Sequence, residues 1–117
     1  MDYDKAMQWA DALESGKYPQ GKFALNRGGK FCCLGVLSDV AADEGIVTRK
    51  EMANGRTAYN REEFVLTHTV REWAGMQGGY DGDVRVEAIN RTLMGLNDKG
   101  TSFPEIATVI REHWESM

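Results

Sequence analysis

The stretch GKFCCLGVLSDVAADEG (residues 29–45) decides the fold, because the spacing of its apolar residues changes within it. From Leu34 onward the apolar side chains follow helical spacing, and Gly45 closes the segment. The residues before Leu34 have the pattern of an extended strand. Cys32 and Cys33 are therefore expected at the point where a strand runs into a central helix.

The residues upstream of this stretch predict the first strand of a hairpin. Phe23 and Leu25 alternate with polar and small residues, as in a strand with one buried face. The glycine pair at residues 28–29 then predicts a tight turn. A second turn signal, Asn-Gly at residues 54–55, predicts a polar hairpin or an irregular flap.

Helices are predicted at both ends of the chain. Apolar residues at helical spacing over residues 2–14 are followed by Gly16, which favours a left-handed cap. Over residues 102–114, Ser102 and Glu105 have the spacing of a capping box at the start of a second apolar face. The predicted apolar face of the first helix consists of Tyr3, Ala6, Met7, Ala10 and Leu13, with Trp9 on its flank.

The region between the second turn and the last helix has a less regular pattern. Thr67 is a suitable N-cap for a short helix that runs through Trp73. Residues 77–83 are expected to form a loop, and residues 84–86 look extended. Apolar residues at helical spacing over residues 89–96 then indicate another helix.

Together these elements predict an α+β fold in a single domain over residues 1–117. We expect the N- and C-terminal helices to pack with the central helix and with a small antiparallel sheet. A chain of 117 residues is long enough to bury a hydrophobic core without disulfides or metal ions. Its two cysteines are adjacent, and neighbouring cysteines rarely bridge because the resulting ring is strained.

Composition and charge argue against several classes of function. The formal net charge of −4 argues against general nucleic-acid binding, which needs an excess of Lys and Arg to neutralise phosphates. The longest apolar run, residues 31–37, is too short to span a membrane. The N-terminus lacks the pattern of a signal peptide. We therefore expect a reduced, cytoplasmic protein that does not bind membranes.

The two cysteines can be interpreted in two ways. A thiol at a helix N-terminus has its thiolate stabilised by the helix dipole, so Cys32 or Cys33 with His68 as base would suit a small thiol-dependent hydrolase. Alternatively, both residues fill the core, because cysteine behaves as a small hydrophobe. The family-specific neighbours of known catalytic cysteines are missing here, which favours packing.

No metal site or cofactor is predicted. Zinc sites use spaced pairs of ligands, whereas here the cysteines are contiguous and His68 and His113 are far apart in the sequence. No phosphate-binding loop or dinucleotide fingerprint occurs in the chain.

A locally basic stretch is the candidate binding surface. Residues 15–30 contain no acidic side chain and are rich in turns. Such a patch in an acidic protein would suit a phosphate or an acidic partner surface, and a tyrosine within it would add a stacking face. The candidate binding residues are Lys17, Tyr18, Gln20, Lys22, Arg27 and Lys30.

Several motifs occur together in the order seen in a known family. They are Ser-Gly-x-Tyr-x-Gln-Gly at residues 15–21, Phe-Cys-Cys-Leu-Gly-Val-Leu at 31–37 and Leu-Asn-Asp-x-Gly-x-Ser-Phe-x-Glu-Ile-Ala at 96–107. In these motifs the chain resembles a family of small, mostly uncharacterised phage and prophage proteins. The resemblance covers nearly the whole chain. It implies a viral or prophage origin and an intracellular setting, and it assigns no catalytic residues.

Small phage proteins without catalytic motifs commonly act by binding. We therefore expect a non-enzymatic protein that inhibits a host or bacterial defence component, either by blocking a protein or by sequestering a nucleotide signal. The cytoplasm of an infected bacterium is the expected location. Besides the thiol hydrolase, a DNA-binding regulator that uses the helical corner over residues 96–114 remains an alternative.

Overall fold

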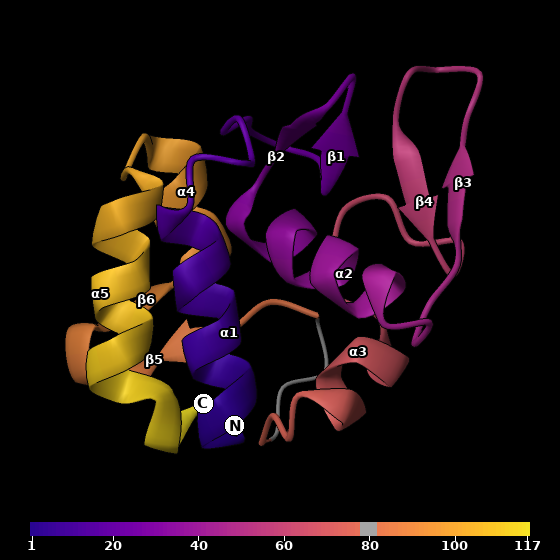
Figure 1. Cartoon of the computed structure of the whole chain (residues 1–117). Helices are drawn as coiled ribbons and strands as arrows, with labels where there is room; N and C mark the ends of the chain where they lie inside the picture. The colour runs from indigo at the N-terminus through magenta and orange to yellow at the C-terminus, as the bar shows by residue number, and fades with distance from the viewer. Residues whose placement is uncertain (78–81) are drawn as a thin grey trace.

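The computed structural model describes residues 1–77 and 82–117, and the predicted α+β class is confirmed (Figure 1). The long helices α1 and α5 lie side by side, and the two chain ends meet where the Met1 ammonium donates to the Met117 carbonyl. The loop predicted over residues 77–83 falls largely on residues 78–81, outside the described residues. The described elements are α1 (Tyr3–Glu14), β1 (Asn26–Arg27), β2 (Lys30–Phe31), α2 (Cys33–Asp43), β3 (Arg49–Glu51), β4 (Thr57–Tyr59), α3 (His68–Trp73), β5 (Arg85–Val86), η1 (Glu87–Ile89), β6 (Arg91–Thr92), α4 (Leu93–Lys99), α5 (Phe103–His113) and η2 (Trp114–Ser116).

Helix α1 is confirmed, but its buried face is rotated from the predicted one. Trp9 is fully buried, and its indole Nε1–H donates to the carbonyl of Cys33 at 2.9 Å. Tyr3 is 55% exposed and packs the edge of its ring against Trp114. The predicted apolar face is therefore confirmed at Ala6, Ala10 and Leu13 and wrong at Tyr3. Trp9, expected on the flank of this face, belongs to the core, where α2 supplies the partner that a buried indole N–H needs. Gly16 ends the helix with a φ of 77°.

Helix α2 is the central helix, and its residues from Cys33 to Ala41 are all buried. It packs against α1 on one side, and the hairpins lie along another side of it (Figure 1). Gly35 permits the closest approach, because a Cβ atom there would lie 1.6 Å from the carbonyl oxygen of Leu25. The cysteine pair lies at the predicted junction, with Cys32 as the N-cap of the helix.

The two predicted hairpins are both present and lie next to each other in the order β2–β1–β4–β3 (Figure 1). A single antiparallel bridge between Arg27 and Arg56 joins them. The N–H of Gly28 also donates to the carbonyl of Gly55 at 3.0 Å, so the two turns touch. Both glycines have positive φ, Gly28 in the two-residue turn of the first hairpin and Gly55 in the longer turn that Met52 and Arg56 close.

The hairpins have an inner face toward α2 and an outer face away from it. Side chains that are opposite in register share a face, and alternate residues point to opposite faces. Asn26 and Phe31 are opposite each other and buried, whereas Arg27 and Lys30 are opposite each other and exposed. Phe23 was expected to share the buried face of Leu25. It is instead 70% exposed, because the segment bends at Phe23 with a φ of 65° before β1 begins.

The C-terminal half contains a third hairpin, whose first strand lies within the predicted extended residues 84–86 and whose second strand the sequence pattern did not indicate. Strands β5 and β6 pair in register Arg85 with Thr92, and Asn90 takes a left-handed conformation between them. The helix expected from residue 89 therefore begins only at Leu93, where the hydroxyl of Thr92 accepts the N–H of Gly95. By contrast, the predicted Thr67 cap is confirmed.

The helices of the described residues are short, and the longest of them, α1, has 12 residues. None of them has both the length and the apolar character that a bilayer crossing requires.

Candidate functional site

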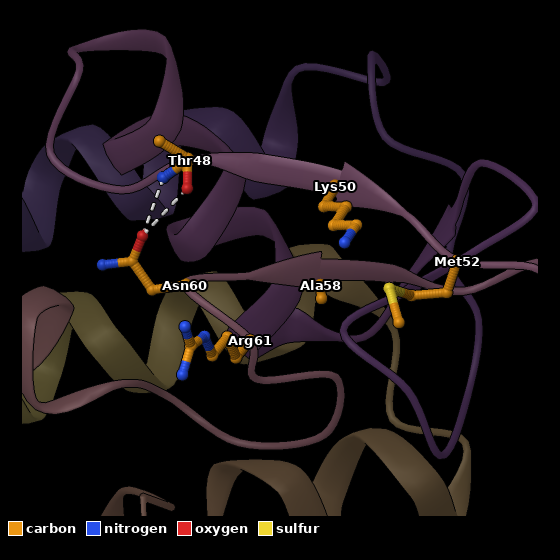
Figure 2. Close-up of a pocket in the computed structure, with 6 residues that line it drawn as sticks. All are labelled: Thr48, Lys50, Met52, Ala58, Asn60 and Arg61. Carbon is orange, nitrogen blue, oxygen red and sulfur yellow. Dashed lines mark hydrogen bonds between the residues drawn. The ribbon is translucent and has the colours of Figure 1, made fainter.

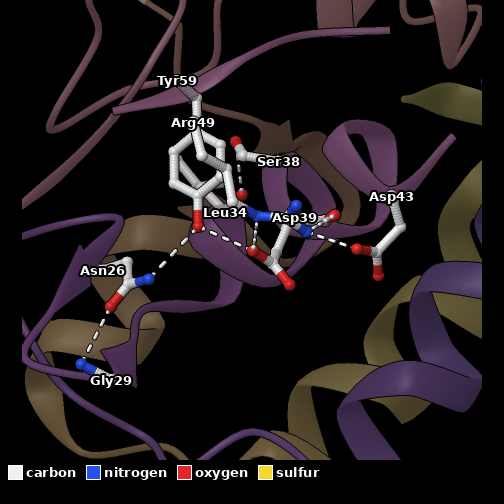
Figure 3. A network of polar contacts seen from close by, with 8 residues as sticks. All are labelled: Asn26, Gly29, Leu34, Ser38, Asp39, Asp43, Arg49 and Tyr59. Atoms are coloured by element: carbon white, nitrogen blue, oxygen red, sulfur yellow. Dashed lines mark hydrogen bonds and ion pairs between the residues drawn. The ribbon is translucent and has the colours of Figure 1, made fainter. Parts of the chain in front are cut away.

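A polar network holds the inner face of the hairpins against α2 (Figure 3). Asp39 accepts a hydrogen bond from the Tyr59 hydroxyl at 2.9 Å and from Arg49 Nε at 2.7 Å. Arg49 also pairs with Asp43, and Asn26 donates to the Tyr59 oxygen at 3.3 Å. Burial, more than the nearby carboxylates, raises the pKa of Tyr59 above its usual range, so this hydroxyl stays protonated and donates. The network orients the hairpins and leaves their outer face free.

The outer face presents two cations directly opposite each other. Arg27 on β1 and Lys30 on β2 are partners in register beside the two-residue glycine turn, and both are exposed. Neither makes an ion pair with any other described residue. Like charges in this arrangement destabilise a hairpin by about 0.2–1 kcal/mol. The face therefore carries a repulsion that an acidic partner would relieve.

Arg56, the next cation across the bridge, has a different environment. Its Nε lies 2.8 Å from Glu63 Oε1, and its guanidinium lies 4.9 Å from the centre of the Phe64 ring. Hydrogen bonds from Arg56 and then Asn54 lower the pKa of Glu63. The charge of Arg56 is thus neutralised within the protein, unlike the charges of Arg27 and Lys30.

The outer face continues along the second hairpin into a groove of about 540 Å³ (Figure 2). Lys50 on β3 lies opposite Ala58 on β4 in register, and Arg61 reaches the groove from the turn after β4. Lys50 and Arg61 are exposed. The groove brings together two cations that lie on different segments of the chain.

Phe23 is the most exposed of the large apolar side chains in the described residues. Its backbone N–H donates to Asp98 Oδ1 at 3.1 Å, which holds the bend. Hydrogen bonds from Gly21 N to the Phe31 carbonyl at 2.7 Å and from Cys32 N to the Ala24 carbonyl at 3.3 Å keep the loop against the β2 edge. An exposed aromatic ring is thus carried by the loop that leads into β1.

The structure brings only part of the predicted binding stretch together. Arg27 and Lys30 share the outer face, and Lys22 is also exposed, on the loop that carries Phe23. Lys17 is exposed but lies apart from them, in a groove between α1 and α2. Asp11, Asp43 and Glu44 also line that groove.

Tyr18 and Gln20 have internal contacts instead. Tyr18 is only 8% exposed, and its ring packs edge-on against Phe31 with centroids 5.0 Å apart. Burial, followed by the charges of Asp39 and Asp43, raises the pKa of Tyr18 to about 12. The expected stacking face on Tyr18 is therefore wrong. Gln20 Nε2 donates to Asn97 Oδ1 at 3.0 Å and joins the hairpin loop to α4.

The cysteine and histidine of the hydrolase alternative are not brought together. Both thiols are free and buried, and Cys33 Sγ donates to the Leu93 carbonyl at 3.4 Å. Burial raises the pKa of Cys32 to about 11 and raises that of Cys33 as well. His68 is largely exposed on α3 and lies 3.4 Å from Glu72. The thiols therefore stay protonated and shielded from solvent near neutral pH.

This burial makes a prediction about thiol labelling. Iodoacetamide near neutral pH is expected to leave the native protein unmodified and to modify both cysteines in urea, because alkylation needs an accessible thiolate. Mass spectrometry of the native and the denatured samples gives the number of modified cysteines directly. Rapid modification of the native protein would contradict the burial and would revive the hydrolase reading.

The helical corner over residues 96–114 presents few free cations. Helix α5 packs on α1, and Arg111 Nη2 lies 2.6 Å from Asp11 Oδ1 and also pairs with Glu14. Glu105, Glu112 and Glu115 are exposed on the same C-terminal segment. This surface does not favour entry into a DNA groove, whose phosphates attract positive charge.

Sequence reasoning had missed part of the outer face. A two-residue turn sets the flanking residues opposite each other, so the pairing of Arg27 with Lys30 was readable from the glycine pair. No sequence pattern indicated that Lys50 and Arg61 lie together, because they line one groove only once the turn after β4 has formed. Among the described residues, no three His, Cys, Asp or Glu side chains are placed to hold a metal ion.

Comparison with known proteins assigns a family to the chain. The sequence model of DUF8296, a domain of unknown function, matches residues 1–114. No curated protein and no solved structure matches the chain. Because the match covers nearly all residues, the chain belongs to the DUF8296 family.

Proposed function

We propose that this chain is a phage-encoded, non-enzymatic protein that inhibits a bacterial defence component by binding it. The docking surface consists of Arg27 and Lys30 together with Phe23. The observation that carries the proposal is the pair of opposed, exposed cations without an acidic partner among the described residues. An acidic patch on a partner would remove their mutual repulsion and speed association.

The exposed aromatic ring supports a protein partner rather than a nucleic acid. Energetic hot spots at protein interfaces are enriched in aromatic and Arg side chains. Phe23 is 70% exposed on the loop whose backbone is hydrogen-bonded to β2. A shallow apolar pocket on the partner protein would bury its ring. The net charge of −4 also opposes approach to a polyanion.

The choice of a defence component rests on the resemblance to phage and prophage proteins. A phage protein of this kind would act in the cytoplasm of the infected bacterium. The buried, protonated thiols are consistent with inhibition by binding, because they leave no exposed thiolate to act on a substrate.

A plating assay tests the proposal. Cells that carry a panel of defence systems express the wild-type chain or the double variant R27E/K30E, and phage plaques are counted on each. We expect the wild type to restore plaques against at least one system and R27E/K30E to lose this effect, because reversed charges repel an acidic patch.

The control variant R91E/K99E changes the net charge by the same amount on exposed residues of β6 and α4. It is expected to behave like the wild type. If folded R27E/K30E restores as many plaques as the wild type, the hairpin cations are not the docking surface. If the wild-type chain restores plaques against none of the defence systems, the inhibitor proposal itself is overturned.

A further inference from the structure

The groove on the second hairpin has the dimensions and lining of a small-molecule site. Its volume of about 540 Å³ lies within the roughly 300–1,000 Å³ typical of ligand pockets. Ala58 forms its floor and is 2% exposed, and Met52 adds a flexible apolar wall. A small side chain opposite the long Lys50 in register leaves this space open.

The charges of the groove all have one sign. Lys50 and Arg61 line it, and neither forms an ion pair within the described part of the chain. The groove between α1 and α2 contains three carboxylates, and the one between the hairpin turns contains Glu51. Of these three grooves, only the one beside β3 and β4 combines two cations with no carboxylate.

The position of Arg61 is set by a turn that normally favours glycine. Tyr59 and Glu62 exchange both backbone hydrogen bonds, at 2.8 and 3.0 Å, around Asn60 and Arg61. Both central residues have positive φ, 46° for Asn60 and 75° for Arg61, as in a type I′ turn. Arginine is unfavourable in this left-handed conformation, whereas the Asn54-Gly55 turn of the same hairpin uses glycine. The backbone strain is tolerated at a position whose side chain lines the groove.

The turn is also anchored to the strand that carries Lys50. Asn60 Oδ1 accepts hydrogen bonds from the Thr48 backbone N–H at 2.9 Å and from its hydroxyl at 3.2 Å. Figure 2 shows this contact at one end of the groove, with Lys50 and Arg61 on either side of Ala58. The backbone positions that carry Lys50 and Arg61 are therefore fixed relative to each other before any ligand arrives.

We infer that this groove binds a phosphorylated small molecule of nucleotide size. Arg61 would receive the phosphate oxygens through its planar fork, and Lys50 would add a point charge. Met52 and Ala58 would contact the apolar or aromatic part of the same ligand. The inference does not depend on the docking of Arg27 and Lys30 on a protein, because it uses different residues.

Titration of the full chain with three probes tests the inference. The probes are AMP, inorganic phosphate and adenosine, followed by amide chemical shifts and by calorimetry. We expect AMP to shift amides over residues 48–52 and 58–61, phosphate to shift the same amides more weakly, and adenosine to shift none at equal concentration. Absence of shifts with both AMP and phosphate, shifts confined to other regions, or equal shifts with adenosine would overturn it.

Two variants separate binding from folding. R61G relieves the left-handed strain, so its thermal midpoint should equal or exceed that of the wild type while its AMP affinity falls by about tenfold or more, the effect of losing a charge-assisted contact. K50Q should weaken AMP binding without loss of stability, and the control K99Q should bind as the wild type does. Unchanged AMP affinity in folded R61G would contradict the assignment of Arg61.

Discussion

Replacement of Gly35 by alanine is expected to destabilise the protein by at least about 3 kcal/mol, the upper range of overpacking effects. The new Cβ would lie 1.6 Å from the carbonyl oxygen of Leu25 and 2.4 Å from its carbonyl carbon. Backbone atoms cannot rotate away as a side chain can. Leu25 is also fully buried, and its N–H donates to the Glu63 carbonyl at 2.8 Å. Relief of the clash therefore requires that the hairpin segment move off α2.

Helix propensity alone predicts the opposite result, because alanine is favoured over glycine in a helix by about 1 kcal/mol. The matched control is G95A in α4, where the new Cβ would meet only the Thr92 hydroxyl, at 2.9 Å. That variant should stay within about 1 kcal/mol of the wild type, the size of the propensity term that offsets a loosened Thr92 cap. Urea denaturation of both variants provides the comparison. A G35A protein as stable as the wild type would disprove the close approach of residue 25 to α2.

Replacement of Asn97 by leucine is the second substitution with a large expected effect. Asn97 is fully buried, and its Oδ1 accepts from Gln20 Nε2 at 3.0 Å and from the backbone N–H of Cys33 at 3.1 Å. Its Nδ2 donates to the carbonyl of Gly21 at 2.9 Å. The N–H of Cys33 belongs to the first turn of α2, where no intrahelical acceptor exists. Leucine would remove the side-chain partner of the Cys33 N–H and of the Gly21 carbonyl, whereas Gln20 would keep its hydrogen bond to the Thr101 carbonyl.

Each buried polar group left unsatisfied costs about 1–3 kcal/mol, so N97L should lose about 3 kcal/mol or more. The control Q20M removes one donor to the same oxygen and a second hydrogen bond to the Thr101 carbonyl, both from a side chain that is exposed. It should cost about 1–2 kcal/mol or less, because each ordinary hydrogen bond has a net value of about 1 kcal/mol and water can replace these partners. Thermal and urea unfolding measure both variants. Equal stabilities of N97L and Q20M would show that Asn97 does not anchor α2.

Asn97 also joins three stretches of the chain that lie far apart in the sequence. Gln20 and Gly21 come from residues 15–21, Cys33 from residues 31–37 and Asn97 itself from residues 96–107, and one amide side chain contacts all of them. Trp9 donates to the carbonyl of the same Cys33. These stretches therefore meet in the packing of the fold.

The elements that the sequence predicted well depend on neighbouring residues. Thr67 accepts the N–H of Val70 at 3.1 Å, and Ser102 lies within hydrogen-bond reach of the N–H of Glu105 at 3.4 Å. These caps act over a single turn of chain, so they are visible in the sequence. Residues 84–86 were predicted to be extended, but the pairing of β5 with β6 was missed because these strands have only two residues each and the left-handed residue between them is Asn90.

By itself the sequence determined the α+β class, the main helices and their caps, and the two glycine-containing hairpin turns. These features depend on local hydrogen bonding, backbone conformation and periodicity. Only the tertiary structure decided that Tyr18 is buried, that Glu63 neutralises Arg56, and that Lys50 and Arg61 share one groove. Burial and charge neutralisation depend on distances through space, which the chain sets only when its segments pack together.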